Sequence, residues 1–413
     1  MLWHDLWHDR DFRRLWLGQT LSQLGEHTSL VVLPLTAVLT LGAGAAELGA
    51  LRAAGQAPLL LLPLLVGAWV DRRRTVPLLV RSDLARAIAL GAAAAAGLVG
   101  ALGLPGLYTV AIAVGALSVL FDVAYQTSLV RLVPAGQLAY GNSALEASRS
   151  SAQTGGPALG GALVSLVSAP IAAAACAAAF AGSALAAGRI SRPEAAPVAP
   201  DAVRPPMVRQ VGEGLRFAAR QPALRALGLA SAAFQFTFSA AMTVQLLYLP
   251  RVLHLSGTEI GLALAATGPG ALLGSLLAAR LPGRVGYGPL LVTAAAVGDG
   301  VLLCVPALPG PSALTFPALL AVQFGFGAGG QLVNVMTMAV RQALAPAGMQ
   351  GRAAATLTFA GMGTTPLGSL LGGALAQTWG LRPAFVVAAA GMLLSPLVMA
   401  LSPLARLGRT LPG

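Results

Sequence analysis

Long apolar runs of about 20 residues recur along this whole chain, and they constrain its fold more than any other feature. As an α-helix, a run of that length crosses the ~30 Å hydrocarbon core of a lipid bilayer. The chain has 413 residues, of which 56% are hydrophobic and only 10% are charged. A soluble domain carries roughly 25% charged residues because its surface faces water. We therefore predict an all-α membrane protein.

Twelve membrane-spanning helices can be delimited at Gly/Pro turns and at clusters of arginine. They are predicted near residues 13–40, 46–70, 76–100, 105–131, 138–167, 169–189, 222–250, 257–280, 287–308, 312–340, 348–378 and 383–404.

The basic residues indicate how these spans are oriented. All 26 are arginine, and 22 of them, Arg86 included, fall on the side of the two termini and of the loops after even-numbered spans. The positive-inside rule then places both termini in the cytoplasm. A chain without lysine also lacks the Walker A lysine of an ATPase. The sequence shows no basic helix with interleaved aromatic residues, so the excess of arginine does not indicate nucleic-acid binding.

The chain contains an internal repeat. Four short segments, at positions 47, 77, 134 and 160, recur at positions 259, 289, 346 and 372, so that every pair has the same separation. We predict two six-helix bundles, at 1–189 and 222–413. A proline-rich cytoplasmic connector at 190–221 joins them and contains a short amphipathic helix. Two parallel repeats with such a hinge are typical of alternating-access carriers.

Glu26 is the first candidate site residue. It lies about 13 residues into the first span, near mid-membrane at ~1.5 Å per residue, between Gln23 and His27. An ionisable group at that depth is costly unless it is paired, solvated or neutralised. We interpret Glu26 as a site for a proton or a cationic substrate. A structural hydrogen bond to a neighbouring helix is the alternative.

Three further acidic residues, Asp122, Glu146 and Asp299, lie within predicted spans. Glu146 and Arg149 are three residues apart and share a helix face, and Asp122 precedes Arg131 on its span. Pairing within the protein is the interpretation favoured for Asp122, Glu146 and Arg149. A direct role in proton or substrate coupling is the alternative. Asp299 has no evident partner in the sequence.

A charged segment follows the second span. Gly67 precedes Asp71 and an arginine run that begins at Arg72, and Asp83 and Arg86 follow. We interpret the segment as a compact charged loop that latches one conformation and releases in the other. It is also compatible with an ordinary positively charged cytoplasmic loop.

The fifth span contains Gly156, Pro157, Gly160 and Gly161. Small residues let helices pack closely, and proline within a span kinks the helix. Aromatic and polar residues on several spans form a candidate substrate cavity, with lipid-facing aromatic side chains as the alternative. The candidate cavity residues are Gln23, His27, Tyr125, Gln126, Phe234, Gln235, Phe238, Gln245 and Phe324.

Six segments carry a resemblance to a known family: FRRLW at 12–16, SQLGE at 22–26, the stretch 67–83, NSAL at 142–145, GPALGG at 156–161 and GEGLR at 212–216. The chain resembles the major facilitator superfamily over nearly its whole length. Within it, the chain is similar to bacterial drug:proton antiporters that include macrolide-efflux and enterobactin-exporter proteins.

The resemblance implies roles for two motifs. The second-loop motif gates conformational change in the family, and the span-five motif marks exporters. These roles fall on Gly67, Asp71, Arg72 and Asp83, and on Gly156, Pro157, Gly160 and Gly161. The chain departs from the family where Arg74 is followed by uncharged residues instead of further charges, and where the span-four arginine motif is absent.

We therefore expect a secondary transporter that exports amphipathic small molecules by proton-coupled alternating access. It is expected to act as a monomer in the lipid bilayer, with no enzymatic activity, cofactor, metal or nucleic-acid partner. The alternatives are a dedicated exporter of one metabolite, such as a siderophore or an antibiotic, and a lipid flippase. From another class, the alternative is a non-transporting membrane sensor or scaffold.

Overall fold

The computed structural model describes residues 6–70, 73–192, 216, 219–308, 310–344 and 361–410, and the regular structure in these ranges is helical. The chain divides into two compact units. Unit 1 comprises residues 1–43 and 54–204, and unit 2 comprises 44–53 and 205–413. Most of the predicted connector at 190–221, including its amphipathic helix, lies outside the described residues.

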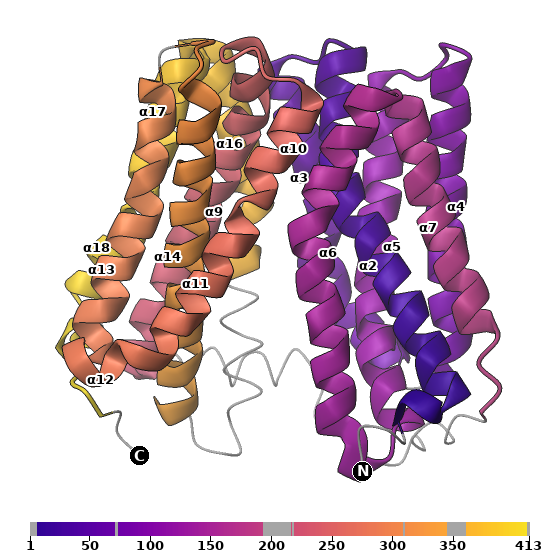
Figure 1. The fold of residues 1–413 in the computed structure, drawn as a ribbon, viewed down its shortest axis with the longest axis horizontal. Helices are drawn as coiled ribbons and strands as arrows, with labels where there is room; N and C mark the ends of the chain where they lie inside the picture. Colours follow the sequence, from indigo (N-terminus) through magenta and orange to yellow (C-terminus); the bar gives the residue numbers. More distant parts are fainter. Residues whose placement is uncertain are drawn as a thin grey trace. The chain divides into compact units, whose positions relative to one another are not determined.

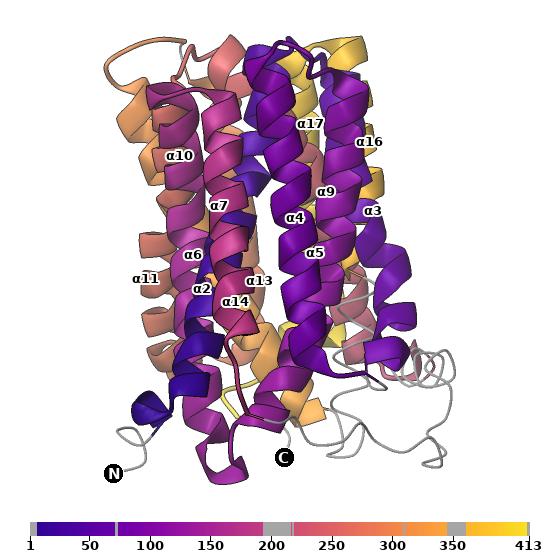
Figure 2. The same cartoon turned by 90° about the vertical axis from the view of Figure 1, so that its right-hand side faces the viewer.

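The first half of the chain forms long helices that continue almost unbroken across each predicted span (Figures 1 and 2). They are α2 (Arg10–Leu35) with its extension η1 (Thr36–Thr40), α3 (Ala45–Val70), α4 (Thr75–Leu98), α5 (Leu104–Leu132), η2 (Ala135–Gln137), α6 (Leu138–Leu166) and α7 (Ala169–Gly188). In unit 1, α2 packs against α6 and α7, and α4 packs against α5 and α7.

The helices of the second half are more often interrupted. They are α9 (Pro222–Arg251), α10 (Gly257–Ala265), α11 (Thr267–Arg280), α12 (Pro282–Val285), α13 (Tyr287–Gly300), η3 (Val301–Ala307), α14 (Thr315–Leu344), α16 (Thr365–Trp379), α17 (Leu381–Met392), α18 (Leu394–Ala400) and η4 (Pro403–Arg406). In unit 2, α9 packs against α16 and α17, and α14 against α11 and α13.

Every predicted span has a helical counterpart, although the eleventh is described only from residue 361 onward. Within the described residues, seven helices are long and apolar enough to cross a membrane by themselves. The predicted all-α membrane fold is therefore confirmed.

Three predicted spans are broken where proline interrupts the helical hydrogen bonds. Proline has no N–H to donate, and its ring clashes with the carbonyl four residues earlier. The eighth span breaks between α10 and α11, just before Pro269, and the twelfth breaks between α17 and α18, just before Pro396. In the ninth, α13 gives way to the tighter η3, which contains Pro306. In unit 2, three spans therefore contain an interruption of the regular α-helix near a proline.

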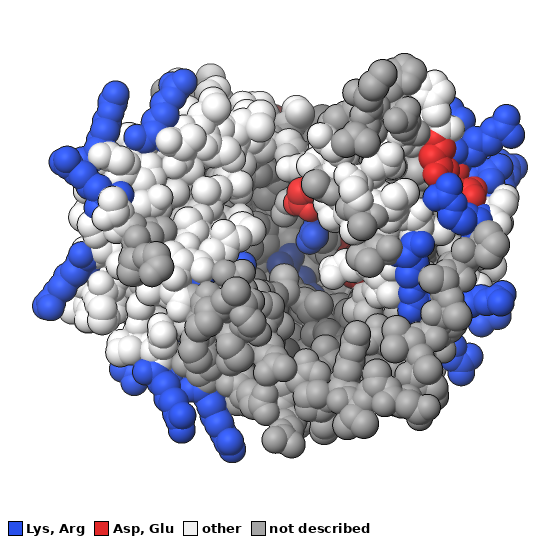
Figure 3. Space-filling view, turned by 90° about the horizontal axis from the view of Figure 1, so that it is seen from below, with Lys and Arg blue, Asp and Glu red and all other residues white. Residues whose placement is uncertain are grey.

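A network of charged groups joins the segment before α2 to the segment that follows α7 in unit 1. The Asp9 side chain caps α2 by accepting hydrogen bonds from the N–H groups of Asp11 and Phe12. The guanidinium of Arg192, just after α7, lies 2.7 Å from Asp9 Oδ2, and the Arg192 N–H donates to Asp11 Oδ2 at 2.8 Å. Figure 3 shows this end of the molecule, where arginine side chains are numerous and acidic ones few.

Candidate functional site

The interior of unit 1 contains a buried ionic cluster centred on Arg86. Arg86 lies on α4, and neither its side chain nor that of Asp83, one helical turn earlier, is exposed to solvent. A guanidinium removed from water is destabilising unless carboxylates and hydrogen-bond acceptors surround it. In this cluster, α2 and α5 provide further partners for the guanidinium.

The hydrogen-bond partners of Arg86 surround its two terminal nitrogens. Nη2 pairs with Asp83 Oδ1 and donates to Ser22 Oγ at 2.9 Å, and Ser22 in turn donates to Asp83 Oδ1 at 3.2 Å. Nη1 donates to Ser118 Oγ at 3.0 Å and lies 3.4 Å from Glu26 Oε2. Arg86 is thereby hydrogen-bonded to residues of α2, α4 and α5.

Two aromatic rings flank the same guanidinium. Its central carbon lies 4.6 Å from the centre of the Phe121 ring and 4.3 Å from that of Phe180. A cation over an aromatic face is attracted by the ring quadrupole, and the attraction reaches about 2 kcal/mol when the pair is desolvated. Phe180 brings α7 into the cluster, so four helices of unit 1 meet at Arg86.

Glu26 differs from the other charged members of the cluster because it is partly accessible. Its side chain is 21% exposed, whereas those of Asp83 and Arg86 are fully buried. With both acids ionised, the cluster has two carboxylates and one guanidinium. Glu26 is thus the carboxylate that solvent can reach, and its contact to Arg86 is longer than that of Asp83.

This arrangement changes the interpretation of Asp83 and Arg86. The sequence analysis grouped both with a charged loop after the second span and counted Arg86 among the surface arginines. The structure places them beyond the first two turns of α4, which begins at Thr75, inside the helical bundle. Their side chains point inward because the bundle offers acidic, hydroxyl and aromatic partners. Asp71 and Arg72 lie outside the described residues, and the backbone of Gly67 lies within α3.

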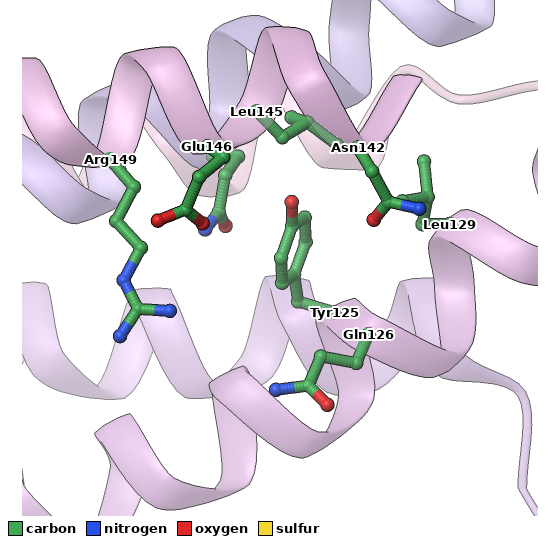
Figure 4. Close-up of a pocket in the computed structure, with 8 residues that line it drawn as sticks. Tyr125, Gln126, Leu129, Asn142, Leu145, Glu146 and Arg149 are labelled. Atoms are coloured by element: carbon green, nitrogen blue, oxygen red, sulfur yellow. The ribbon is translucent and has the colours of Figure 1, made fainter. Parts of the chain in front are cut away.

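Unit 1 also contains a pocket of about 390 Å³, formed by α2, α5 and α6. Its lining residues are Gln19, Tyr125, Gln126, Leu129, Asn142, Leu145, Glu146 and Arg149. The four from α6 are spaced at helical intervals, which places them on one face of the helix. Figure 4 shows the polar side chains of α6 directed toward α5, with the Tyr125 hydroxyl pointing between Asn142 and Glu146.

The pairing favoured from the sequence does not occur at this pocket. Among the described residues, no ion pair joins Glu146 to Arg149, and none joins Asp122 to Arg131. Arg131 instead donates a hydrogen bond to the carbonyl of Arg73 at 2.8 Å. Glu146 and Arg149 are exposed, so both charges face the space that they line. His27 and Gln23 lie on α2, and Gln23 is buried.

The glycines of the span-five motif allow α6 to approach α2 closely. A Cβ atom on Gly156 would lie 2.7 Å from the Cβ of His27, and one on Gly160 would lie 2.9 Å from the carbonyl oxygen of Thr28. Neither position therefore has room for a side chain unless the two helices move apart. The other two residues of the motif complete this helix, since Pro157 lies inside α6 and Gly161 is buried.

Unit 2 repeats this contact at the equivalent positions of the second repeat. Gly372 on α16 corresponds to Gly160, and Ala240 on α9 corresponds to Thr28. A Cβ on Gly372 would lie 2.5 Å from the carbonyl oxygen of Ala240. The close approach is therefore a property of both repeats.

In unit 2, two of the predicted cavity residues, Phe234 and Phe238, form an aromatic stack with Phe326, which was not among them. The Phe238 ring lies 5.4 Å from that of Phe234 and 5.5 Å from that of Phe326 on α14, with near-parallel planes in both pairs. Phe324 is 38% exposed, and Gln235 is partly buried on α9. Gln245 is only 1% exposed. The structure thus brings the phenylalanines together and places Gln245 in the interior.

Asp299 lies on α13 and is 4% exposed, and within the described residues no hydrogen bond or ion pair reaches it. The sequence analysis missed Ser118 and Phe180 as members of the ionic cluster. A signal for Phe180 exists, because it is the one aromatic residue in the alanine-rich α7. Ser118 has no comparable signal, since serine is common in apolar helices.

Comparisons with known proteins agree with this architecture. Residues 5–410 match the family described as transmembrane secretion effector. The multidrug efflux pump Tap of Mycolicibacterium fortuitum is 28% identical over 365 residues, which cover 85% of each chain.

Solved structures show the same fold. A bacterial homologue of the iron transporter ferroportin superimposes with a TM-score of 0.76 at 18% identity, over 94% of this chain and 98% of that one. The nucleoside transporter NupG has a TM-score of 0.75 at 14% identity, with coverage of 94% and 98%. A bacterial homologue of the lysosomal transporter Spinster has a TM-score of 0.70 at 16% identity, over 96% of both chains. The chain belongs to the transmembrane secretion effector family of the major facilitator superfamily, whose members are multi-pass membrane transporters.

Proposed function

We propose that the protein exports amphipathic small molecules by proton-coupled alternating access, with Glu26 as the residue that exchanges the proton. The observation that carries this proposal is the asymmetry of the ionic cluster. Glu26 is the partly accessible carboxylate on an otherwise buried Asp83–Arg86 pair. The similarity to a multidrug efflux pump supports outward transport and a broad range of substrates.

The charge balance of the cluster explains how a proton changes its energy. Among Asp83, Arg86 and Glu26, one guanidinium neutralises one carboxylate, so ionised Glu26 leaves a surplus negative charge within a low-dielectric bundle. Asp122 and Arg149, which interact with these residues electrostatically, add one charge of each sign. Protonation of Glu26 removes that surplus charge and leaves Arg86 in an ion pair with Asp83 alone. Burying a neutral cluster costs far less than burying a charged one. Protonated Glu26 therefore favours a conformation in which this site is closed to water.

The same proposal places the chain in the inner membrane of a bacterium, with both termini in the cytoplasm, and treats it as a monomer. The distribution of the 26 arginines supports this orientation. The aromatic stack of Phe234, Phe238 and Phe326 supports a cavity wall for substrates that contain rings.

Transport in proteoliposomes tests the role of Glu26. An imposed proton gradient should drive uptake or release of a fluorescent amphipathic dye by the wild type and not by Glu26→Gln. Exchange of labelled for unlabelled dye without a gradient should persist in the variant, because that reaction needs no proton transfer. Glu259→Gln is the matched control, since glutamine is accepted at this helix-capping position.

Two results would contradict the proposal. Gradient-driven transport by Glu26→Gln at the wild-type rate would exclude Glu26 as the coupling residue. Equal loss of gradient-driven transport and of exchange would show that Glu26 only supports the fold or binds the substrate.

A further inference from the structure

In the described ranges, the pocket of unit 1 contains one buried polar atom without a hydrogen-bond partner. Gln19 is 3% exposed, lines this pocket, and its Oε1 atom has no hydrogen-bond donor among the described residues. A buried amide oxygen without a donor destabilises the protein, because it has lost its hydrogen bonds to water without gaining another. Four other polar residues of the lining are exposed and form no hydrogen bond or ion pair within the described part of the chain: Gln126, Asn142, Glu146 and Arg149. The carboxyl group of Asp122 interacts with Arg149 electrostatically without a direct ion pair.

Two of these residues carry opposite charges on adjacent turns of one helix. Glu146 and Arg149 are three residues apart on α6, a spacing that places their Cβ atoms about 5–6 Å apart. They line the same pocket without pairing with each other. The formal charge of the lining is therefore zero, but it is separated into a negative and a positive site.

The geometry points to this pocket as a binding site for zwitterionic small molecules, whose ammonium group pairs with Glu146 and whose carboxylate pairs with Arg149. An amino-acid head group carries its two charges a few ångströms apart, which suits acceptor and donor sites one helical turn apart. Gln19 Oε1 accepts a further hydrogen bond from the ligand, and the apolar Leu129 and Leu145 contact its uncharged part.

Other ligand charges suit the pocket less well. A cation would leave Arg149 unpaired and an anion would leave Glu146 unpaired, and each unpaired charge loses solvation when a ligand fills the site. A neutral ligand would leave both charges unpaired. The volume of about 390 Å³ lies at the lower end of the range of roughly 300–1,000 Å³ typical of small-molecule sites. The pocket therefore fits a compact head group with a small ring system.

A matched set of fluorescent probes tests the charge requirement. We suggest an α-amino acid with a coumarin side chain, the corresponding primary amine that lacks the carboxylate, the N-acetyl derivative of the amino acid and its N-acetyl methyl ester. These four are a zwitterion, a cation, an anion and a neutral molecule that share the same coumarin side chain. Binding to the full-length protein in lipid nanodiscs is measured by fluorescence anisotropy at pH 7. The zwitterion should bind about tenfold or more tightly than each of the others, because charge-assisted hydrogen bonds are worth about 1.5–3 kcal/mol each.

Variants assign each charge of the ligand to its partner. Glu146→Gln should weaken binding of the zwitterion and the cation, and leave the anion unaffected. Arg149→Gln should weaken binding of the zwitterion and the anion, and leave the cation unaffected. Glu259→Gln and Arg225→Gln remove equivalent charges from unit 2, outside this pocket, and should change none of the four affinities.

The inference rests on the proposed export function for its physiological meaning, but the binding test does not depend on it. Binding is measured at equilibrium without a proton gradient, so failure of proton coupling leaves the result unchanged. Equal affinity for all four probes would overturn the inference. So would a preference for the zwitterion that survives both Glu146→Gln and Arg149→Gln.

Discussion

Arg86 is the residue on which the interior of unit 1 depends. It is among the largest fully buried side chains in the described residues, and it contacts groups on four helices. A buried arginine is stable only while its carboxylate remains, and the carboxylate only while the arginine remains. Asp83 and Arg86 therefore act energetically as one unit.

This interdependence can be measured by a double-mutant cycle. Arg86→Met leaves Asp83 buried without a counter-ion and should lower the unfolding free energy by about 3–5 kcal/mol. Asp83→Asn combined with Arg86→Met should recover most of that loss, since the carboxylate that remains, Glu26, is partly exposed to solvent. Thermal unfolding in detergent reports the difference. Strictly additive losses in the double variant would contradict the assigned pairing.

Sequence reasoning reached part of this cluster and not the rest. Glu26 could be identified because an acid in the middle of an apolar run of about 20 residues has few structural explanations. Asp83 and Arg86 were assigned to a loop because they follow an arginine run closely. Whether an arginine near a helix end points outward or inward depends on which side chains the neighbouring helices offer. That information becomes available only when the helices are packed.

At the scale of helices, the two repeats share close glycine contacts. Gly160 on α6 meets Thr28 on α2, and Gly372 on α16 meets Ala240 on α9, each at a distance that leaves no room for a Cβ atom. The resemblance to exporters attaches a functional meaning to the span-five glycines, whereas the structure gives them a packing role that both halves share. The internal repeat is thus visible in three dimensions at a specific contact.

A neighbouring pair of glycines provides a matched test of this packing. Gly156→Ala should lower stability by about 1–3 kcal/mol, because α6 must move away from His27. Gly155→Ala meets nothing within 4 Å and should be neutral or slightly stabilising, since alanine favours helix by about 1 kcal/mol over glycine. The measurement is the unfolding temperature of each variant. Equal unfolding temperatures for Gly155→Ala and Gly156→Ala would contradict the packing role of Gly156.

The span boundaries were predictable because hydrophobic length and turn residues are local properties. The interruptions within spans were not predicted, although their cause, proline at 269, 306 and 396, is visible in the sequence. Proline inside a membrane helix is compatible with a kink, a short 3₁₀ segment or a complete break. Which of these occurs depends on whether neighbouring helices satisfy the freed carbonyl groups.

At the scale of the whole molecule, the two halves share a scaffold and differ in charge. In the second repeat, the positions equivalent to Asp83, Arg86 and Ser118 are Ala295, Gly298 and Gly330. In unit 2 this region is filled by backbone contact, since a Cβ on Gly298 would lie 2.9 Å from the Cα of Gly329. Phe238 stands where unit 1 has Glu26, and it is part of the aromatic stack. The ionic cluster is specific to the first repeat.

The orientation of the molecule can be tested with single cysteines. In a background with Cys176 and Cys304 replaced by serine, Ala101→Cys lies in the exposed loop after α4, and Arg74→Cys lies in the exposed segment before it. A membrane-impermeant maleimide added to intact cells should label the cysteine at position 101 and not the one at position 74. In permeabilised cells, the maleimide should label the cysteines at both positions. The reverse pattern would place the termini outside the cell.

The composition of the ionic cluster has a thermodynamic consequence for a proton-driven pump. Two carboxylates share one guanidinium, so in the proposed mechanism this cluster gains and loses one proton per cycle while its buried pair stays intact. Each elementary charge that crosses about 100 mV supplies ~2.3 kcal/mol. A tenfold concentration ratio of an uncharged or zwitterionic substrate costs about 1.4 kcal/mol. If one proton is exchanged for one substrate molecule, a proton-motive force of about 100 mV therefore sustains a concentration ratio of at most about 50-fold.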